Sequence, residues 1–197
     1  YHNCTASQRE RADNACKYRT IGNQIHCLLN GINVNLRAAC TDFRYLQSLC
    51  RFAEPLAGLL SPSLAVEFSG DYCKRIVEEV KDENFAVIYH NCGNTANVTL
   101  DSILSAHANA YHFGNAVDME EIMSKVPSDV ICMGNVDPAG QFRNGTPESV
   151  REATLSVMEK CCKYPNFVIS SGCDIPPMSS WDNIDAFFNA VDEFYAK

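Results

Sequence analysis

The chain has 197 residues, of which 46% are hydrophobic and 20% are charged, and this composition is typical of a soluble globular domain with one core. Its formal net charge of −8 would repel a polyanion, and no basic run interleaved with aromatic residues offers a track for phosphates, which argues against a nucleic-acid partner. No stretch has the ~20 consecutive apolar residues that a membrane helix needs, and the first residues are too polar for a secretory signal. We therefore expect no membrane contact and a cytoplasmic location.

The eleven cysteines are the most unusual feature of the composition. In a secreted protein they would indicate a disulfide framework, so a disulfide-rich extracellular binder is one alternative. Their number is odd, however, and several lie in apolar stretches, where a thiol serves as a small hydrophobic side chain. Those cysteines are Cys27, Cys50, Cys132 and Cys161. We expect most of the cysteines to be reduced and buried.

Residues 1–48 differ from the rest of the chain. They are polar and basic at the start, and they contain the turn signal Leu28-Leu29-Asn30-Gly31 but no clean strand. We predict a separate N-terminal segment of loose helices for them. From residue 49 onward, short apolar runs alternate with longer segments of helical period, which is typical of a parallel sheet covered by helices. The sequence therefore predicts an α/β fold for residues 49–197.

Five short, mostly apolar runs are the candidate strands of this fold. Each is followed closely by Gly, Asn, Pro or Asp, residue types that end strands and begin loops. The runs are Leu49–Ala53, Phe85–Tyr89, Ala110–Phe113, Val130–Met133 and Phe167–Ser170.

Two helices begin at a serine or threonine followed by proline, which supply an N-cap and a first helical residue. After Ser61-Pro62, apolar residues recur every four positions and predict one buried stripe, which consists of Leu64, Phe68, Tyr72, Ile76 and Val80. After Thr146-Pro147, the predicted inward face consists of Val150, Ala153, Val157 and Cys161.

Two further helices have weaker start signals. Asp118 with Glu121 resembles a capping box and predicts a short helix. Ser180 can cap a final helix. The inward stripe of that helix consists of Ile184, Phe187, Phe188, Val191 and Phe194.

Residues able to bind a metal lie at the carboxyl ends of the predicted strands, where ligands bind in parallel α/β folds. His90 and Cys92 flank one residue at the end of an extended run, so their side chains leave on the same side and can share an ion. Cys173 follows the last predicted strand, at the equivalent end. One nitrogen and two sulfur ligands suit zinc, and an open fourth position would let an incoming thiol bind and lose its proton. The alternatives are a chance H-x-C pair and a buried Cys173 thiol.

Other polar residues at strand ends have structural alternatives. Glu54 can cap the next helix or form a surface ion pair, and Asp137 and Asp174 can cap turns. We interpret His107 as a residue of a helix face and His112 as a strand residue, because neither has a partner at metal spacing.

Five motifs occur in a fixed order along the chain. They are AEPLAGLLSP at 53–62, YHNCG at 89–93, GNVDP at 134–138, GTPE at 145–148 and SGCDIPP at 171–177. Together they resemble the uroporphyrinogen decarboxylase superfamily, and within it the branch of methylcobamide:coenzyme M methyltransferases.

That resemblance implies a (β/α)8 TIM barrel with a catalytic zinc ion held by His90, Cys92 and Cys173. It further implies transfer of a methyl group from a methylated corrinoid (methylcobamide) on a partner protein to a small thiol activated by Zn²⁺. Two further sets of residues follow as candidates. Glu54 becomes a candidate catalytic residue, as an exchangeable fourth ligand or a group that orients substrate, and Asp137 becomes a second. Asn135 and Asp174 become candidate substrate contacts.

The resemblance begins only near Ala53, whereas a complete barrel needs about 250 residues and eight strands. With five βα units evident, we expect an incomplete barrel whose open edges lead to homo-oligomerisation or are covered by residues 1–48. Two alternatives to methyl transfer remain. A uroporphyrinogen decarboxylase-type lyase would need an arginine-rich pocket for a substrate with many carboxylates, and the sequence has no such cluster. A truncated, non-catalytic relative would bind zinc or a partner without catalysis.

Overall fold

The structure is a computed structural model that describes residues 49–54, 60–82 and 85–196. The prediction of helices in residues 1–48 therefore lies outside the described residues. Within the described part, five parallel strands form one sheet in the order in which they occur in the chain. The strands are β1 (Leu49–Ala53), β2 (Ala86–Asn91), β3 (Ala110–Phe113), β4 (Ile131–Val136) and β5 (Phe167–Ser171).

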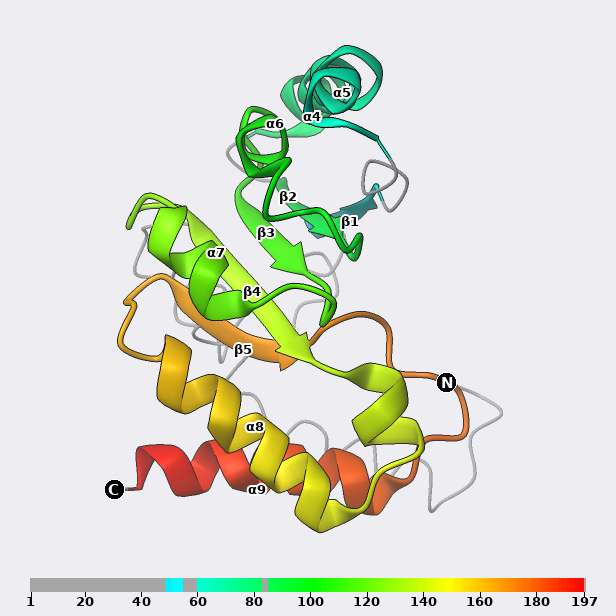
Figure 1. Ribbon diagram of the computed structural model, residues 1–197, viewed down its shortest axis with the longest axis vertical. Helices are drawn as coiled ribbons and strands as arrows, with labels where there is room; N and C mark the ends of the chain where they lie inside the picture. Colours follow the sequence, from blue (N-terminus) through cyan, green and yellow to red (C-terminus); the bar gives the residue numbers. More distant parts are fainter. Residues whose placement is uncertain (1–48, 55–59, 83–84, 197) are drawn as a thin grey trace. The chain divides into compact units, whose positions relative to one another are not determined.

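Helices follow the strands, as the βα pattern requires. They are α4 (Pro62–Ala65), η4 (Val66–Gly70), α5 (Asp71–Val80), α6 (Leu100–Leu104), α7 (Met119–Lys125), η5 (Pro138–Arg143), α8 (Pro147–Cys161) and α9 (Trp181–Tyr195). Helices α6, α7 and α8 lie along one side of the sheet, and α9 packs against α8 (Figure 1). Sequential parallel strands with their helices on one side form a partial TIM barrel, which confirms the predicted fold class.

The predicted helix starts are also confirmed. Ser61 and Thr146 each accept a hydrogen bond from a backbone N–H of the first turn, with proline at the next position. Asp118 caps α7 by accepting from the backbone N–H groups of Glu120 and Glu121, and Ser180 caps α9.

Register places aromatic residues on the helix side of the sheet. Phe52, Tyr89 and Tyr111 are aligned on the neighbouring strands β1, β2 and β3. The ring centroid of Tyr89 lies 5.7 Å from that of Phe52 and 5.9 Å from that of Tyr111. The Tyr89 hydroxyl lies 3.9 Å from the Sγ of Cys73 on α5, which identifies this face as the one toward the helices. The next row, which includes His90 and His112, therefore faces the opposite, inner side of the sheet.

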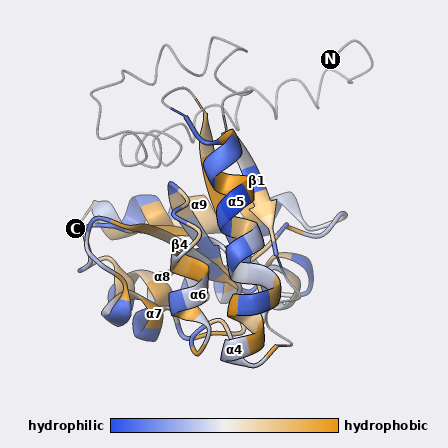
Figure 2. Cartoon of the chain, turned by 90° about the horizontal axis from the view of Figure 1, so that it is seen from above, coloured by the Kyte–Doolittle hydropathy of each residue, from blue (hydrophilic) through white to orange (hydrophobic). Residues whose placement is uncertain are grey.

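The predicted buried stripe on the first helix is wrong. Its five residues are 41% to 61% exposed: Leu64, Phe68, Tyr72, Ile76 and Val80. The buried face belongs instead to Ala65, Ser69, Cys73 and Val77, which have the same four-residue spacing one position further on. Gly70, which is also buried, allows this face to pack closely against α6, because a Cβ on Gly70 would lie only 2.6 Å from Ser102 Oγ. Figure 2 shows the mixture of hydrophobic and hydrophilic residues along α4 and α5.

The buried face predicts that two substitutions in the continuous helical segment 62–80 change the free energy of unfolding by different amounts. Val77 is fully buried, so Val77→Ala should lower the free energy of unfolding by about 2 kcal/mol. Phe68 is 61% exposed, so Phe68→Ala should change it by less than about 1 kcal/mol despite the larger deletion. Urea denaturation of both variants checks the order, and a larger loss for Phe68→Ala would contradict the assignment of the buried face.

The inward faces of the last two long helices are confirmed in part. In α8, Val150 and Cys161 are buried as predicted, but Thr154 and Met158 are buried in place of Ala153 and Val157. In α9 the buried residues are Asn183, Phe187, Ala190 and Val191, whereas Ile184, Phe188 and Phe194 are half-buried.

Asn183 connects α9 to the segment that follows β4. Its side-chain amide is buried and donates to the carbonyl oxygens of Gln141 at 3.3 Å, Phe142 at 3.1 Å and Gly145 at 3.0 Å. These carbonyls lie in the last turn of η5 and just after it, and the Gln141 carbonyl also accepts from the backbone N–H of Gly145 at 3.0 Å.

Two further expectations concerned the cysteines and membrane-spanning helices. Six cysteines whose side chains the structure describes are free thiols, which agrees with the expectation of reduced cysteines: Cys73, Cys92, Cys132, Cys161, Cys162 and Cys173. Three of them, Cys73, Cys132 and Cys161, are buried as expected, and the other three are half-buried. Among the described helices, none combines the length and apolar character needed to cross a membrane.

Candidate metal centre

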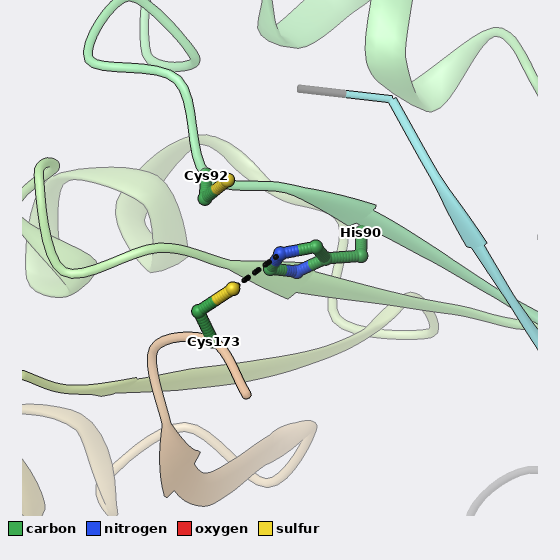
Figure 3. Close-up of side chains that lie close together, drawn as sticks. All are labelled: His90, Cys92 and Cys173. Carbon is green, nitrogen blue, oxygen red and sulfur yellow. Dashed lines mark hydrogen bonds between the residues drawn. The ribbon is translucent and has the colours of Figure 1, made fainter. Parts of the chain in front are cut away.

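His90, Cys92 and Cys173 converge at the carboxyl end of the sheet (Figure 3). His90 lies near the end of β2, Cys92 follows in the adjoining loop, and Cys173 lies in the loop after β5. One ligand atom from each side chain lies within 4.8 Å of the others. The Sγ of Cys173 is 3.4 Å from His90 Nε2, joined by the dashed line in Figure 3. The three residues that the sequence predicted to converge therefore do lie side by side in the fold.

The imidazole of His90 has the tautomer that a metal ligand needs. Its Nδ1 lies 3.2 Å from the carbonyl oxygen of His112, which can only accept a hydrogen bond. Nδ1 therefore carries the proton, and Nε2 presents its lone pair to Cys173. Burial lowers the pKa of His90 to about 4, with a smaller contribution from His112, so the ring is neutral at pH 7.

The spacing of the Cys173 and His90 donor atoms fits zinc. Tetrahedral Zn²⁺ with bonds of about 2.3 Å to sulfur and about 2.0 Å to nitrogen places S and N about 3.5 Å apart. The observed separation between Cys173 Sγ and His90 Nε2 is 3.4 Å. Burial raises the pKa of the Cys92 thiol, and the neighbouring Cys173 raises it further, so a bound cation would favour the thiolate form of Cys92.

The backbone around Cys92 is held by Asn91. This residue is fully buried; its Nδ2 donates to the Glu54 carbonyl at 3.0 Å, and its Oδ1 accepts from the backbone N–H of Gly93 at 2.9 Å. Asn91 thus links the residue after Cys92 to the residue that follows β1. Gly114 supports the same loop, because a Cβ there would lie 2.6 Å from the Cα of Cys92.

The loop that carries Cys173 is fixed by several polar contacts. The N–H of Gly172 donates to the Val136 carbonyl at 2.7 Å, and the Ser171 hydroxyl donates to the Cys173 carbonyl at 2.7 Å. Asp174 forms two hydrogen bonds of 2.7 Å with the guanidinium of Arg51, which lies on β1. This pair holds the pKa of Asp174 below its ordinary value.

The other predicted site residues are not in this cluster of donor atoms. Asp137 caps η5 by accepting from Ala139 and Gly140, and Asn135 donates to the carbonyls of Gly114 and Val117. Asn135 and Asp137 also line a cavity of about 300 Å³ between α7 and α8. The backbone N–H of Glu54 donates to the His90 carbonyl at 2.9 Å. Their catalytic or substrate roles, and that of Asp174, remain predictions.

Sequence reasoning missed three residues that shape the centre: His112, Asn91 and Gly114. His112 was assigned to a strand without a role at the site. The available signal was register, because parallel pairing aligns His112 in one predicted strand with His90, the residue directly after its neighbour Phe85–Tyr89.

A five-stranded parallel sheet with this cluster at its carboxyl ends defines a partial α/β barrel that carries a group of one histidine and two cysteines able to hold a metal ion. The uroporphyrinogen decarboxylase (URO-D) family profile matches residues 47–194, and the chain belongs to this family.

Relatives come from both enzyme groups of the family. The methylcobamide:CoM methyltransferase MtbA of Methanosarcina acetivorans is 28% identical over 156 residues, which cover 74% of this chain and 44% of that protein. The uroporphyrinogen decarboxylase of Coxiella burnetii is 28% identical over 144 residues, which cover 71% of this chain and 39% of that protein.

A solved structure has the same fold. It is a methyltransferase from Methanosarcina mazei with a TM-score of 0.65 and 22% identity, over 75% of this chain and 42% of that chain. The chain thus spans less than half the length of these relatives.

Proposed function

We propose that this chain carries the metal centre of a zinc-dependent methyltransferase, which moves a methyl group from a methylated corrinoid to a small thiol. The convergence of His90, Cys92 and Cys173 is the observation that supports the proposal. The similarity to MtbA, whose name specifies a methylcobamide and coenzyme M, supports a corrinoid partner protein as the methyl donor.

The donor set favours zinc over harder cations. Imidazole and thiolate ligands suit Zn²⁺, whereas Mg²⁺ and Ca²⁺ prefer oxygen. Three protein ligands leave a fourth tetrahedral position for a substrate, as in catalytic zinc sites. Zinc bound here would lower the pKa of a coordinating substrate thiol and so supply a thiolate nucleophile at neutral pH.

The chain's own residues prepare the site for that chemistry. His90 is held in its neutral form with Nε2 directed at the cluster, which requires no proton release from the ring when a metal binds. Asn91 and Gly114 fix the backbone of Cys92, so Cys92 keeps its position relative to His90.

Decarboxylation is less well supported by the described residues. Its substrate carries many carboxylates and would need several cationic groups on the inner face. Arg51 lies beside the metal-binding cluster, but its guanidinium is already bound by Asp174 through two hydrogen bonds. Two cysteines and a histidine have no use in a reaction that needs no metal.

A methyl-transfer assay tests the proposal. The zinc-loaded protein is incubated with methylcobalamin and a panel of thiols that includes coenzyme M, and the cobalt–carbon bond loss is followed by absorbance. The methyl group passes to sulfur, the bond electrons remain on cobalt as cob(I)alamin, and the thiol proton goes to solvent. We expect methylated thiol to form at a rate above that of free zinc, and Cys92→Ser to remove the excess rate. Zinc binding without any methyl transfer would instead support the non-catalytic relative.

A further inference from the structure

The side chain of His112 lies beside the metal centre without belonging to its group of ligand atoms. His112 is on β3, directly aligned with His90 on β2, and only 8% of it is exposed. The two imidazole rings have centroids 4.5 Å apart. A buried polar ring needs hydrogen-bond partners, and those of the His112 ring lie on the segment that leads to Cys173.

The ring of His112 reaches the segment that carries Cys173. Its Nε2 lies 2.6 Å from the carbonyl oxygen of Ser171, which can only accept, so Nε2 carries a hydrogen and donates it. The Ser170 hydroxyl lies 3.2 Å from the same nitrogen and donates to the same carbonyl at 2.9 Å. The Ser171 hydroxyl in turn donates to the carbonyl of Cys173.

The backbone of His112 acts on the other strand. Its carbonyl oxygen accepts the Nδ1 hydrogen of His90 and so directs His90 Nε2 toward Cys173. One residue on β3 thus contacts both segments that supply ligands, from β2 on one side and from the end of β5 on the other.

We propose that His112 is a positioning residue, whose ring holds the Ser171–Cys173 segment at the distance from His90 that a shared metal ion requires. This inference rests on the proposed metal centre but assigns His112 neither a ligand role nor contact with substrate. It explains why the Cys173 thiol lies within 3.4 Å of His90 although 83 residues separate them in the sequence.

Two substitutions separate the hydrogen bond from the bulk of the ring. His112→Phe keeps a buried aromatic ring but leaves the Ser171 carbonyl without this donor, and we expect zinc affinity to fall about 10- to 100-fold. His112→Gln keeps an N–H group in the place of Nε2 and should restore most of the affinity. Tyr111→Phe is the matched control, because it removes a hydrogen bond to the Leu104 carbonyl from the opposite face of the same strand. Its zinc affinity should equal that of the parent protein.

A second readout needs no metal. In the metal-free protein, iodoacetamide alkylation of each cysteine is followed by mass spectrometry. In His112→Phe we expect Cys173 to react several-fold faster while the rate at Cys92 is unchanged, since only the Cys173 segment has lost its support. A general loss of stability would accelerate both, and thermal unfolding of each variant measures that loss separately.

The outcomes distinguish this inference from the proposed function. If the parent protein binds zinc, and His112→Phe binds it equally well with unchanged alkylation of Cys173, the positioning role is wrong and the metal centre stands. If the parent protein binds no zinc, the proposed function fails, and the alkylation rates alone decide whether His112 holds the segment. In a Cys173→Ser background, His112→Phe should cause no further loss of zinc affinity, and an additive loss would contradict the proposal.

Discussion

Cys173→Ser is expected to lower the affinity for zinc by more than about 100-fold, a larger loss than changes around a metal ligand cause. A serine hydroxyl remains protonated at neutral pH and is a poor partner for Zn²⁺, so His90 and Cys92 would be left as a two-residue site. Competition with a chromophoric chelator measures the affinity, and elemental analysis should give one zinc per parent chain.

The control for this change is Cys162→Ser. Cys162 is another half-buried free thiol, and it lies outside the group of converging ligand atoms, 3.8 Å from the Tyr195 hydroxyl. Its replacement should leave zinc content and affinity unchanged. Equal losses in the two variants would mean that the cysteines bind metal without forming the specific centre described above.

Gly114→Ala is expected to reduce zinc affinity at least about tenfold although it replaces none of the proposed ligands. The new methyl group would lie 2.6 Å from the Cα and 2.7 Å from the Cβ of Cys92. Both atoms belong to the ligand residue itself, so the collision must displace the Cys92 thiol or separate the ends of β2 and β3. Titration with cobalt provides the measurement, because the sulfur-to-cobalt absorption reports how many thiolates bind the ion and its dependence on cobalt concentration gives the affinity.

Gly145→Ala provides a matched collision elsewhere in the chain. A Cβ at Gly145 would lie 2.6 Å from the Gln141 carbonyl and 2.6 Å from Ser149 Oγ, neither of which belongs to the ligand cluster. We expect this variant to lose stability and to retain its zinc affinity. A loss of affinity in Gly145→Ala equal to that in Gly114→Ala would show that the effect is general unfolding.

The convergence of His90, Cys92 and Cys173 could be predicted from the sequence because parallel strands end at one edge of the sheet. Once Tyr89 and Phe167 are placed in strands, the residues that follow them must approach the same edge, whatever their separation along the chain. The chemistry of His90, Cys92 and Cys173 then restricts what they can bind. The fold class and the convergence of these three side chains could therefore both be predicted from the sequence, whereas their role as metal ligands stays a prediction.

Side-chain direction and steric support were not accessible in the same way. The helix from Pro62 to Val80 has apolar residues on two faces, and the choice of the larger ones as the buried face was wrong because Gly70 and Ala65 allow the closer approach. The role of Gly114 depends on a contact between the ends of two neighbouring strands, and that of His112 on a hydrogen bond to a backbone atom of β5. Neither contact has a local sequence pattern.

Asn183 makes the last helix a part of the loop architecture beyond β4. A chain shortened before Trp181 would lose a single amide group and thereby leave three backbone oxygens, at residues 141, 142 and 145, without that donor. The end of η5 would then keep only its backbone hydrogen bonds, from Asn144 to Ala139 and from Gly145 to Gln141. Helix α9 thus stabilises the segment after β4 through Asn183, in addition to packing against α8.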